Sequence, residues 1–273
     1  MKRAHLKLFG IPIRVEPIFF LLVGFIAFQG QDDVFFTTAW IVIVTASVLI
    51  HELGHAFAYR HYGASPAVAL YGLGGLTIGH NSGHLSPRQR IVVAAAGSTT
   101  TMVLLGGPAW LALQGLDLTG ESRDIVRAIF FVNVVWAAIN LAPVFPLDGG
   151  HIIDDGLLLL TGKSQRRLVN WISLIGAVAI GGYFFVSWGS TFVLIIFGYM
   201  AWVNLSQLRM ANGNRPRPRG PSLEEVLAPR PEAPKSAPAP PTDWSNQPPP
   251  IAPRTGPPGS VPPDPTERRS PNV

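Results

Sequence analysis

Long apolar segments alternate with short polar connections along the first 208 residues of the chain. Most of these segments are close to the roughly 20 residues that a helix needs to cross the hydrocarbon core of a bilayer. The pattern predicts about six membrane-spanning helices, near Pro17–Phe28, Val34–Tyr59, Ile91–Leu113, Ile125–Val144, Leu168–Val186 and Thr191–Leu208. The first of these segments is short, and the last two are joined by only a few polar and glycine residues, as in a helical hairpin.

The pattern changes completely after the sixth segment. From Gly213 onward the chain holds 19 of its 26 prolines and almost no apolar clusters. Such a segment cannot bury a core, so we expect it to be disordered with local polyproline character. The sequence therefore predicts a transmembrane domain over residues 1–208 and a Pro-rich tail over residues 209–273, with an unknown protein as a possible partner of the tail.

Basic residues gather on one side of the predicted spans. The N-terminus, the connections after the second and fourth segments, and the C-terminal flank carry most of the Lys and Arg residues, whereas the opposite side has only Arg123 and Arg127 among several acidic residues. Short loops rich in Lys and Arg stay in the cytoplasm. We therefore predict a multi-pass protein of the cell membrane with both termini, and hence the tail, in the cytoplasm.

The composition agrees with a membrane protein. Hydrophobic residues make up 48% of the chain and charged residues only 14%, with a mean hydropathy of +0.30. The pI of about 9.9 comes from basic residues that flank apolar segments, so we expect the lipid bilayer and not nucleic acid as the partner. The chain has no cysteine, so any metal site must be built from His, Asp or Glu.

The second segment contains three ionisable side chains, His51, Glu52 and His55, near the end of the apolar run Val34–Phe57. Charged groups inside a bilayer cost a few kcal/mol each even on mild insertion scales. Residues i and i+4 lie one turn apart on one helix face, so both imidazoles can bind one ion, while Glu52 lies about 100° round the helix beside it. A lone histidine on an apolar face would be an ordinary core residue, but the full pattern favours a zinc site with a base.

A third ligand is predicted at the end of the fourth segment. The second and fourth segments run in the same direction, so His55 and Asp148 approach the same membrane face. Pro143 and Pro146 cannot continue a regular helix, and irregular backbone at membrane depth is tolerated where it is buried or lines a wet cavity. We expect Gly149–Gly150 to make a sharp turn that aims Asp148 at the metal. The alternative is that Asp148 is only a loop or cap residue.

Two separated motifs thus occur in order within the predicted spans. They are His51-Glu52-Leu53-Gly54-His55 and the later set Asn140, Pro143, Pro146 and Leu147-Asp148-Gly149. Together they resemble the site-2 protease family of intramembrane zinc metalloproteases, over about residues 1–208. The resemblance implies an all-α membrane protein with about six transmembrane helices that cleaves membrane-embedded substrate proteins. Family members often carry a PDZ or CBS domain, but no segment here is long enough to hold one.

The resemblance also implies a role for each matching residue. His51, His55 and Asp148 would bind one Zn²⁺ per chain, and Glu52 would be the catalytic base. Asn140 belongs to the family's Asn-Pro-Asp-Gly motif and would contact the substrate or the developing oxyanion.

The sequence departs from the family pattern in the third segment. Family members often have Ala-Gly-Pro and a nearby Asn there, whereas this chain has Ala96-Gly97-Ser98-Thr99-Thr100-Thr101. The departure puts helix packing or a supporting polar contact in doubt, but not the metal site.

The connection from Gly63 to Pro87 mixes β-forming residues with glycines, and Val68–Ile78 predicts a small interfacial β-hairpin. Its edge could pair with an unwound substrate segment, or the connection could be a loop that merely caps the site. We expect the remaining histidines to be ordinary loop residues, with His151 ambiguous because it follows Gly150; the others are His5, His61, His80 and His84.

Two alternative functions belong to other classes of protein. A transporter or metal-handling protein could use the same intramembrane His and Asp groups, but transporters often show internal repeats with a broken helix in each half, and here only one span is broken by proline. A catalytically inactive scaffold is disfavoured because both the expected zinc ligands and the base are present.

Overall fold

The computed structural model describes residues 6–28, 33–72 and 74–211. The chain divides into two compact units, residues 1–229 and 230–273, and every described residue lies in the first. The predicted Pro-rich tail lies outside the described residues, apart from residues 209–211, which continue the last helix.

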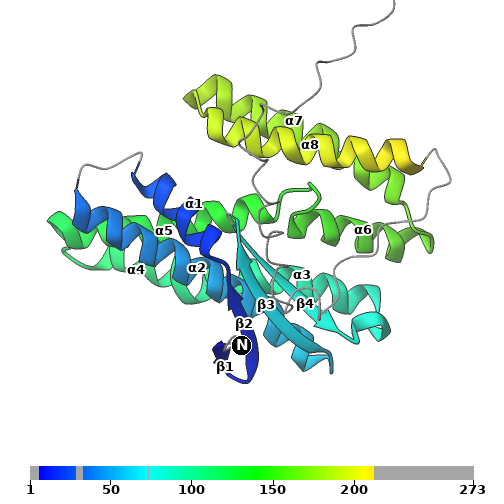
Figure 1. The fold of residues 1–273 in the computed structure, drawn as a ribbon, viewed down its shortest axis with the longest axis horizontal. Helices are drawn as coiled ribbons and strands as arrows, with labels where there is room; N and C mark the ends of the chain where they lie inside the picture. The colour runs from blue at the N-terminus through cyan, green and yellow to red at the C-terminus, as the bar shows by residue number, and fades with distance from the viewer. Residues whose placement is uncertain (1–5, 29–32, 73, 212–273) are drawn as a thin grey trace, which may run out of the picture. The chain divides into compact units, whose positions relative to one another are not determined.

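The described residues form a mostly helical protein with one small sheet (Figure 1). In chain order the elements are β1 (Leu6–Leu8), β2 (Ile11–Val15), α1 (Pro17–Phe28), α2 (Val34–His61), β3 (Ser65–Tyr71), β4 (Gly74–His80), the 3₁₀ helix η1 (Ser82–His84), α3 (Pro87–Thr101), the π-helical turn η2 (Met102–Gly106), α4 (Gly107–Gly115), α5 (Gly120–Asn140), α6 (Asp148–Thr161), α7 (Arg166–Trp188) and α8 (Thr191–Ala211).

Four of the described helical segments are long and apolar enough to cross a membrane, which identifies a membrane protein. They are α2, the continuous run Pro87–Gly115, α7 and α8. The first predicted span forms only the 12-residue helix α1, and the fourth forms α5, which carries four charged residues in its first turns, Glu121, Arg123, Asp124 and Arg127. Both segments are therefore helical, but their length and composition alone do not identify them as spans.

The third span is not a uniform α-helix, so the expectation that a proline interrupts only one span was wrong. It begins at a capping box, in which Ser86 and Gln89 exchange hydrogen bonds at the start of α3. It then passes through η2, where the N–H of Gly107 bonds to the carbonyl of Met102. Pro108 follows directly, and since proline has no N–H and clashes with the preceding turn, it explains the local widening.

The predicted hairpin is present and forms half of a four-stranded sheet in the order β1-β2-β3-β4. β3 and β4 pair antiparallel from Ser65 opposite His80 to Tyr71 opposite Gly74. β2, which the sequence analysis did not predict, pairs parallel with β3, and β1 pairs antiparallel with β2. β4 is thus an edge strand. The apolar face of the sheet packs with α1 and α2 into a core that includes Ile13, Phe19, Leu53 and Val68.

The chain after α5 forms a helix where the sequence predicted a sharp turn. α5 ends at Asn140, consistent with the prolines that follow, but Gly149 and Gly150 do not make a turn; they lie in the first turn of α6. Their lack of a side chain serves close packing instead. A Cβ atom on Gly149 would lie 2.1 Å from the carbonyl oxygen of Leu141, and one on Gly150 would lie 2.7 Å from the nitrogen of Phe145. α6 lies between α3 and the α7–α8 hairpin (Figure 1).

Candidate metal centre

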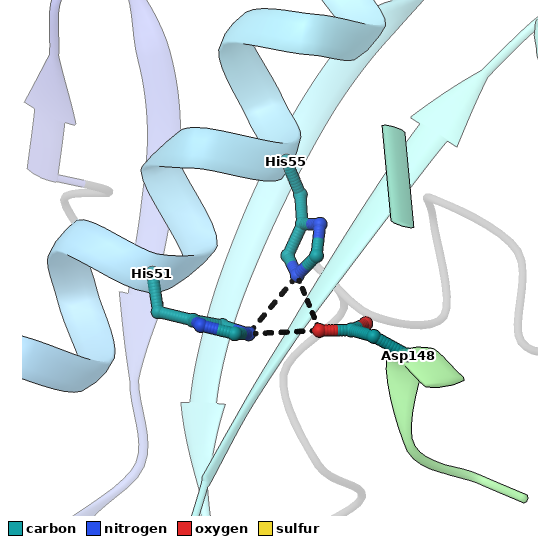
Figure 2. Close-up of side chains that lie close together, drawn as sticks. All are labelled: His51, His55 and Asp148. Atoms are coloured by element: carbon teal, nitrogen blue, oxygen red, sulfur yellow. Dashed lines mark hydrogen bonds and ion pairs between the residues drawn. The ribbon is translucent and has the colours of Figure 1, made fainter. Parts of the chain in front are cut away.

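His51 and His55 extend from one face of α2 toward Asp148, the first residue of α6 (Figure 2). The Nε2 atoms of the two imidazoles are 3.1 Å apart. Oδ2 of Asp148 lies 3.2 Å from Nε2 of His51 and 3.4 Å from Nε2 of His55. Both histidines are buried and Asp148 is nearly so. Three side chains from two distant parts of the sequence therefore converge on one point.

The geometry of the three ligand atoms fits a zinc ion. Ligands of tetrahedral zinc, each about 2.0–2.1 Å from the metal, lie about 3.3–3.4 Å from one another. The three observed separations, 3.1, 3.2 and 3.4 Å, are close to that value. Oδ2 of Asp148 is also buried and accepts no hydrogen bond from any described residue. A nitrogen–nitrogen–oxygen set without thiolate is a usual catalytic zinc set, which leaves one position for water.

Helix α3 orients the second histidine. Nδ1 of His55 lies 2.7 Å from the carbonyl oxygen of Val93, so Nδ1 carries the proton and donates it to that carbonyl. The Nε2 lone pair is then free to face the ion, an arrangement common among metal-binding histidines. Nδ1 of His51 is buried, and no described residue offers it a hydrogen bond.

Two glycines allow α2 and α3 to approach closely at this point. A Cβ atom on Gly97 would lie 2.4 Å from Nε2 of His55 and 2.8 Å from Cε1 of His51. A Cβ atom on Gly54 would lie 2.7 Å from both the carbonyl oxygen of Ala96 and Oγ1 of Thr100. The imidazoles thus rest directly on the backbone of α3, and no larger residue fits at position 97.

Glu52 is held by the edge strand of the sheet. Its side chain is buried, and the hydroxyl of Thr77 on β4 lies 2.6 Å from Oε2 and 3.0 Å from the backbone oxygen of Glu52. A Cβ atom on Gly75 would lie 2.3 Å from Cγ of Glu52, so the strand passes directly over the carboxylate. The hairpin therefore positions the predicted base as well as covering it.

The loop that leads to Asp148 is fixed by the α7–α8 hairpin. The N–H of Phe145 donates to the hydroxyl of Ser173 on α7 at 3.0 Å, and its carbonyl accepts from the amide of Asn204 on α8 at 2.8 Å. The guanidinium carbon of Arg166 lies 4.1 Å from the centre of the Phe145 ring. Ser173 and Asn204 are buried polar residues in otherwise apolar spans. Their presence in these spans was a signal in the sequence for such contacts, which were not predicted.

An apolar cavity of about 170 Å³ lies among four of the described helices. It is lined by residues of α1, α2, α5 and α8, including Val23, Ser47, Trp136 and Ile196. Ser47 precedes His51 by about one helical turn, and its hydroxyl is buried without a hydrogen-bond partner among the described residues. One residue of its lining thus lies about one helical turn from the first histidine on α2.

The other residues singled out in the sequence lie at or near the ends of helices and strands. Asn140 is the half-buried last residue of α5, and its role stays a prediction. His84 contacts the carbonyls of Asn81 and Tyr62. His61 ends α2 and His80 ends β4, so the expectation that they are loop residues was wrong, and His5 lies outside the described residues. The ring of His151 packs against that of Phe145, at 4.7 Å between centres.

No protein-family model matches the chain. The chain is 31% identical over 176 residues to a Synechocystis protein named as a candidate zinc metalloprotease, covering 60% of this chain and 46% of that protein. It is 26% identical over 149 residues to a zinc metalloprotease of Methanocaldococcus jannaschii, covering 54% and 43% respectively. The chain thus spans less than half the length of these two relatives.

Among solved structures, the site-2 protease from Methanocaldococcus jannaschii has a similar fold. The TM-score is 0.54 with 21% sequence identity, over 75% of this chain and 94% of that one. At this identity the likeness establishes the fold alone.

Proposed function

We propose that this chain, which has the fold of a site-2 protease and sequence relatives named zinc metalloproteases, is an intramembrane zinc metalloprotease. It hydrolyses peptide bonds of membrane-embedded substrate proteins. The observation that carries the proposal is the convergence of His51, His55 and Asp148, whose ligand atoms all lie within 4.8 Å of one another.

In this mechanism His51, His55 and Asp148 hold one zinc ion. When bound there, zinc supplies Lewis-acid chemistry, since it lowers the pKa of water toward about 7 and polarises a carbonyl. Glu52 accepts the proton of the attacking water and returns it to the leaving amine. Thr77 keeps the Glu52 carboxylate in place for both transfers. Asn140 donates a hydrogen bond to the substrate or to the developing oxyanion.

The apolar cavity and the edge strand support a membrane-embedded substrate. An apolar side chain of the substrate fits the cavity beside Ser47, which offers a single hydroxyl for an unwound backbone. β4 has one unpaired edge, and an extended substrate segment can pair with such an edge. The substrate must be extended because hydrogen bonding in a helix shields its carbonyls from attack.

In the membrane arrangement that we propose, six segments span the bilayer: the four long apolar segments named above, together with α1 and α5. Both termini lie in the cytoplasm, because the basic connections fall on that side. The catalytic domain is residues 1–208, and residues 209–273 form a cytoplasmic tail.

The substitution Glu52→Gln tests the role of the base. The amide keeps the shape and the contact with Thr77 but cannot accept a proton. We expect zinc content to be unchanged and cleavage of a membrane-embedded substrate to fall by at least about 100-fold. Cleavage is measured with purified protein in proteoliposomes and zinc by elemental analysis. Glu121→Gln, at an exposed position of α5, is the matched control and should cleave normally. Full activity of Glu52→Gln would remove Glu52 from the mechanism.

The substitution Asp148→Ala tests the third ligand. Removing one of three protein ligands should lower the bound zinc well below one ion per chain and abolish cleavage. Asp117→Ala, which changes an exposed carboxylate, should keep its zinc. An unchanged stoichiometry in Asp148→Ala would exclude Asp148 as a ligand.

A further inference from the structure

An ion pair away from the metal centre joins α6, which carries Asp148, to α3. The guanidinium of Arg90 binds the Asp155 carboxylate through two nitrogens: Nε lies 2.9 Å from Oδ1 and 3.1 Å from Oδ2, and Nη2 also contacts Oδ1. Asp155 is 8% exposed, so the positive charge of Arg90 compensates for the burial of its carboxylate. Nη1 of Arg90 donates to the carbonyl oxygen of Leu85 at 2.9 Å, just before α3 begins.

This ion pair lies on the same face of each helix as the metal-site contacts. On α6, Asp155 follows Asp148 by seven residues, which is about two turns and brings it back to the same side. On α3, Arg90 precedes Gly97 by the same interval. Gly97 is the residue that contacts both imidazoles. The two helices therefore run antiparallel, with the metal centre at one end of their contact and the ion pair at the other.

α3 contacts both halves of the metal centre. It holds the histidine half through the carbonyl of Val93 and the backbone at Gly97. It holds the aspartate half through the Arg90–Asp155 pair. Asp148 lies on a different helix from the histidines, so its distance from them depends on how α6 is placed against α3.

We propose that Arg90 and Asp155 are positioning residues that set the place of Asp148 relative to His51 and His55. This inference rests on the proposed function, since it assumes that the three side chains bind zinc. A bidentate Arg–carboxylate pair fixes direction as well as distance, so it resists both sliding and rotation of α6 along α3.

Asp124 and Arg127 of α5 provide a matched control. They form an exposed ion pair at 3.8 Å within one helix. Removing both partners takes one charge of each sign from the chain, as removing Arg90 and Asp155 does, without changing the contact between α3 and α6.

The experiment uses the full chain in detergent micelles. It compares Arg90→Ala/Asp155→Ala, the charge exchange Arg90→Asp/Asp155→Arg, and the control Asp124→Ala/Arg127→Ala. Removing both partners avoids leaving a buried charge alone, which could by itself unfold the protein. Zinc affinity is measured by competition with a chelator, the absorption spectrum of the Co²⁺-substituted protein reports ligand geometry, and thermal unfolding of the metal-free protein reports stability.

We expect the double alanine variant to bind zinc about 10- to 100-fold more weakly, as for other residues that support metal ligands, and to show a changed Co²⁺ spectrum. The charge exchange should recover both, and Asp124→Ala/Arg127→Ala should match the wild type. A wild-type affinity and spectrum in the double alanine variant, even with lower thermal stability, would overturn the inference. An exchange variant that recovers stability but not affinity would overturn it as well. If the wild-type chain itself binds no zinc, the proposed function fails, and this inference fails with it.

Discussion

At the scale of single residues, the metal centre is shaped as much by glycines as by its polar side chains. Gly97 contacts the two imidazoles and Gly75 contacts Glu52. Neither has a positive φ angle, so the requirement is for space and not for backbone freedom. The sequence motif identified the histidines and the acidic residue, but it gave no indication that the backbones of α3 and β4 pass so close to them.

Alanine substitutions of these two glycines should therefore affect zinc binding and catalysis differently. In Gly97→Ala the new methyl group displaces His51 and His55, so both zinc affinity and cleavage should fall by at least about 10-fold. In Gly75→Ala the methyl group displaces only Glu52, so zinc should remain bound while the cleavage rate falls by a similar factor. Zinc content and the rate of substrate cleavage are measured on the same purified preparations.

Two further glycines serve as controls for these substitutions. Gly74 lies beside Gly75 in β4, and Gly156 lies in α6; a Cβ atom on either meets nothing within 4 Å. Gly74→Ala and Gly156→Ala should keep both zinc and activity, and the second should stabilise α6 by up to about 1 kcal/mol. Normal zinc binding by Gly97→Ala would contradict the close contact with the imidazoles.

At the scale of elements, α6 is the largest departure from the sequence-based expectation. Gly149 and Gly150 were expected to make a sharp turn, because glycine adopts backbone conformations that other residues rarely adopt. They lie instead in the first turn of a helix, where glycine is required because the loop at Leu141 and Phe145 leaves no room for a side chain. The direction of Asp148 therefore depends on a helix and on the loop before it, not on a flexible turn.

The loop at Phe145 offers a test at this scale. Ser173→Ala leaves the buried N–H of Phe145 without its acceptor, which should cost about 1–3 kcal/mol. We expect a lower midpoint of thermal unfolding in detergent and, because Asp148 follows this loop, weaker zinc binding. Ser187→Ala, at an exposed position near the end of the same helix, should leave both unchanged. An unaltered midpoint in Ser173→Ala would show that the loop is not held by this bond.

At the scale of the whole molecule, the described helices and sheet share the fold of a site-2 protease. Four helical segments have the length and composition of membrane spans, which agrees with a multi-pass membrane protein. The number of spans follows from the apolar segments and the side on which the termini lie follows from the distribution of basic residues, and both remain predictions.

The absence of cysteine makes the orientation simple to test, because each introduced thiol is the only one in the chain. Ser122→Cys lies at the start of α5 and Lys163→Cys lies between α6 and α7, both at exposed positions. With intact cells and a membrane-impermeant maleimide, we expect labelling of Ser122→Cys alone, since positively charged connections stay in the cytoplasm. Both thiols should react once the membrane is permeabilised. The opposite labelling pattern would reverse the proposed orientation.

The sequence by itself determined the features that depend on short-range spacing. Apolar length predicted the helices other than α6. The interval between His51 and His55 placed two imidazoles on one face, because helix geometry is the same wherever the helix lies. Pro143 and Pro146 predicted an irregular segment, although the fourth apolar segment was expected to reach Val144 and α5 ends at Asn140. The shared direction of the second and fourth segments predicted that Asp148 approaches His55, and its carboxylate meets both histidines.

Only the tertiary structure decided which groups support those residues. Thr77 holds Glu52, Val93 orients His55, and the Arg90–Asp155 pair joins α6 to α3. None of these contacts has a fixed interval along the chain, because each joins elements that become neighbours only when the helices and the sheet pack together. Side-chain spacing along one helix is a local property, whereas the distance from Asp148 to the histidines is set by the packing of α2, α3 and α6.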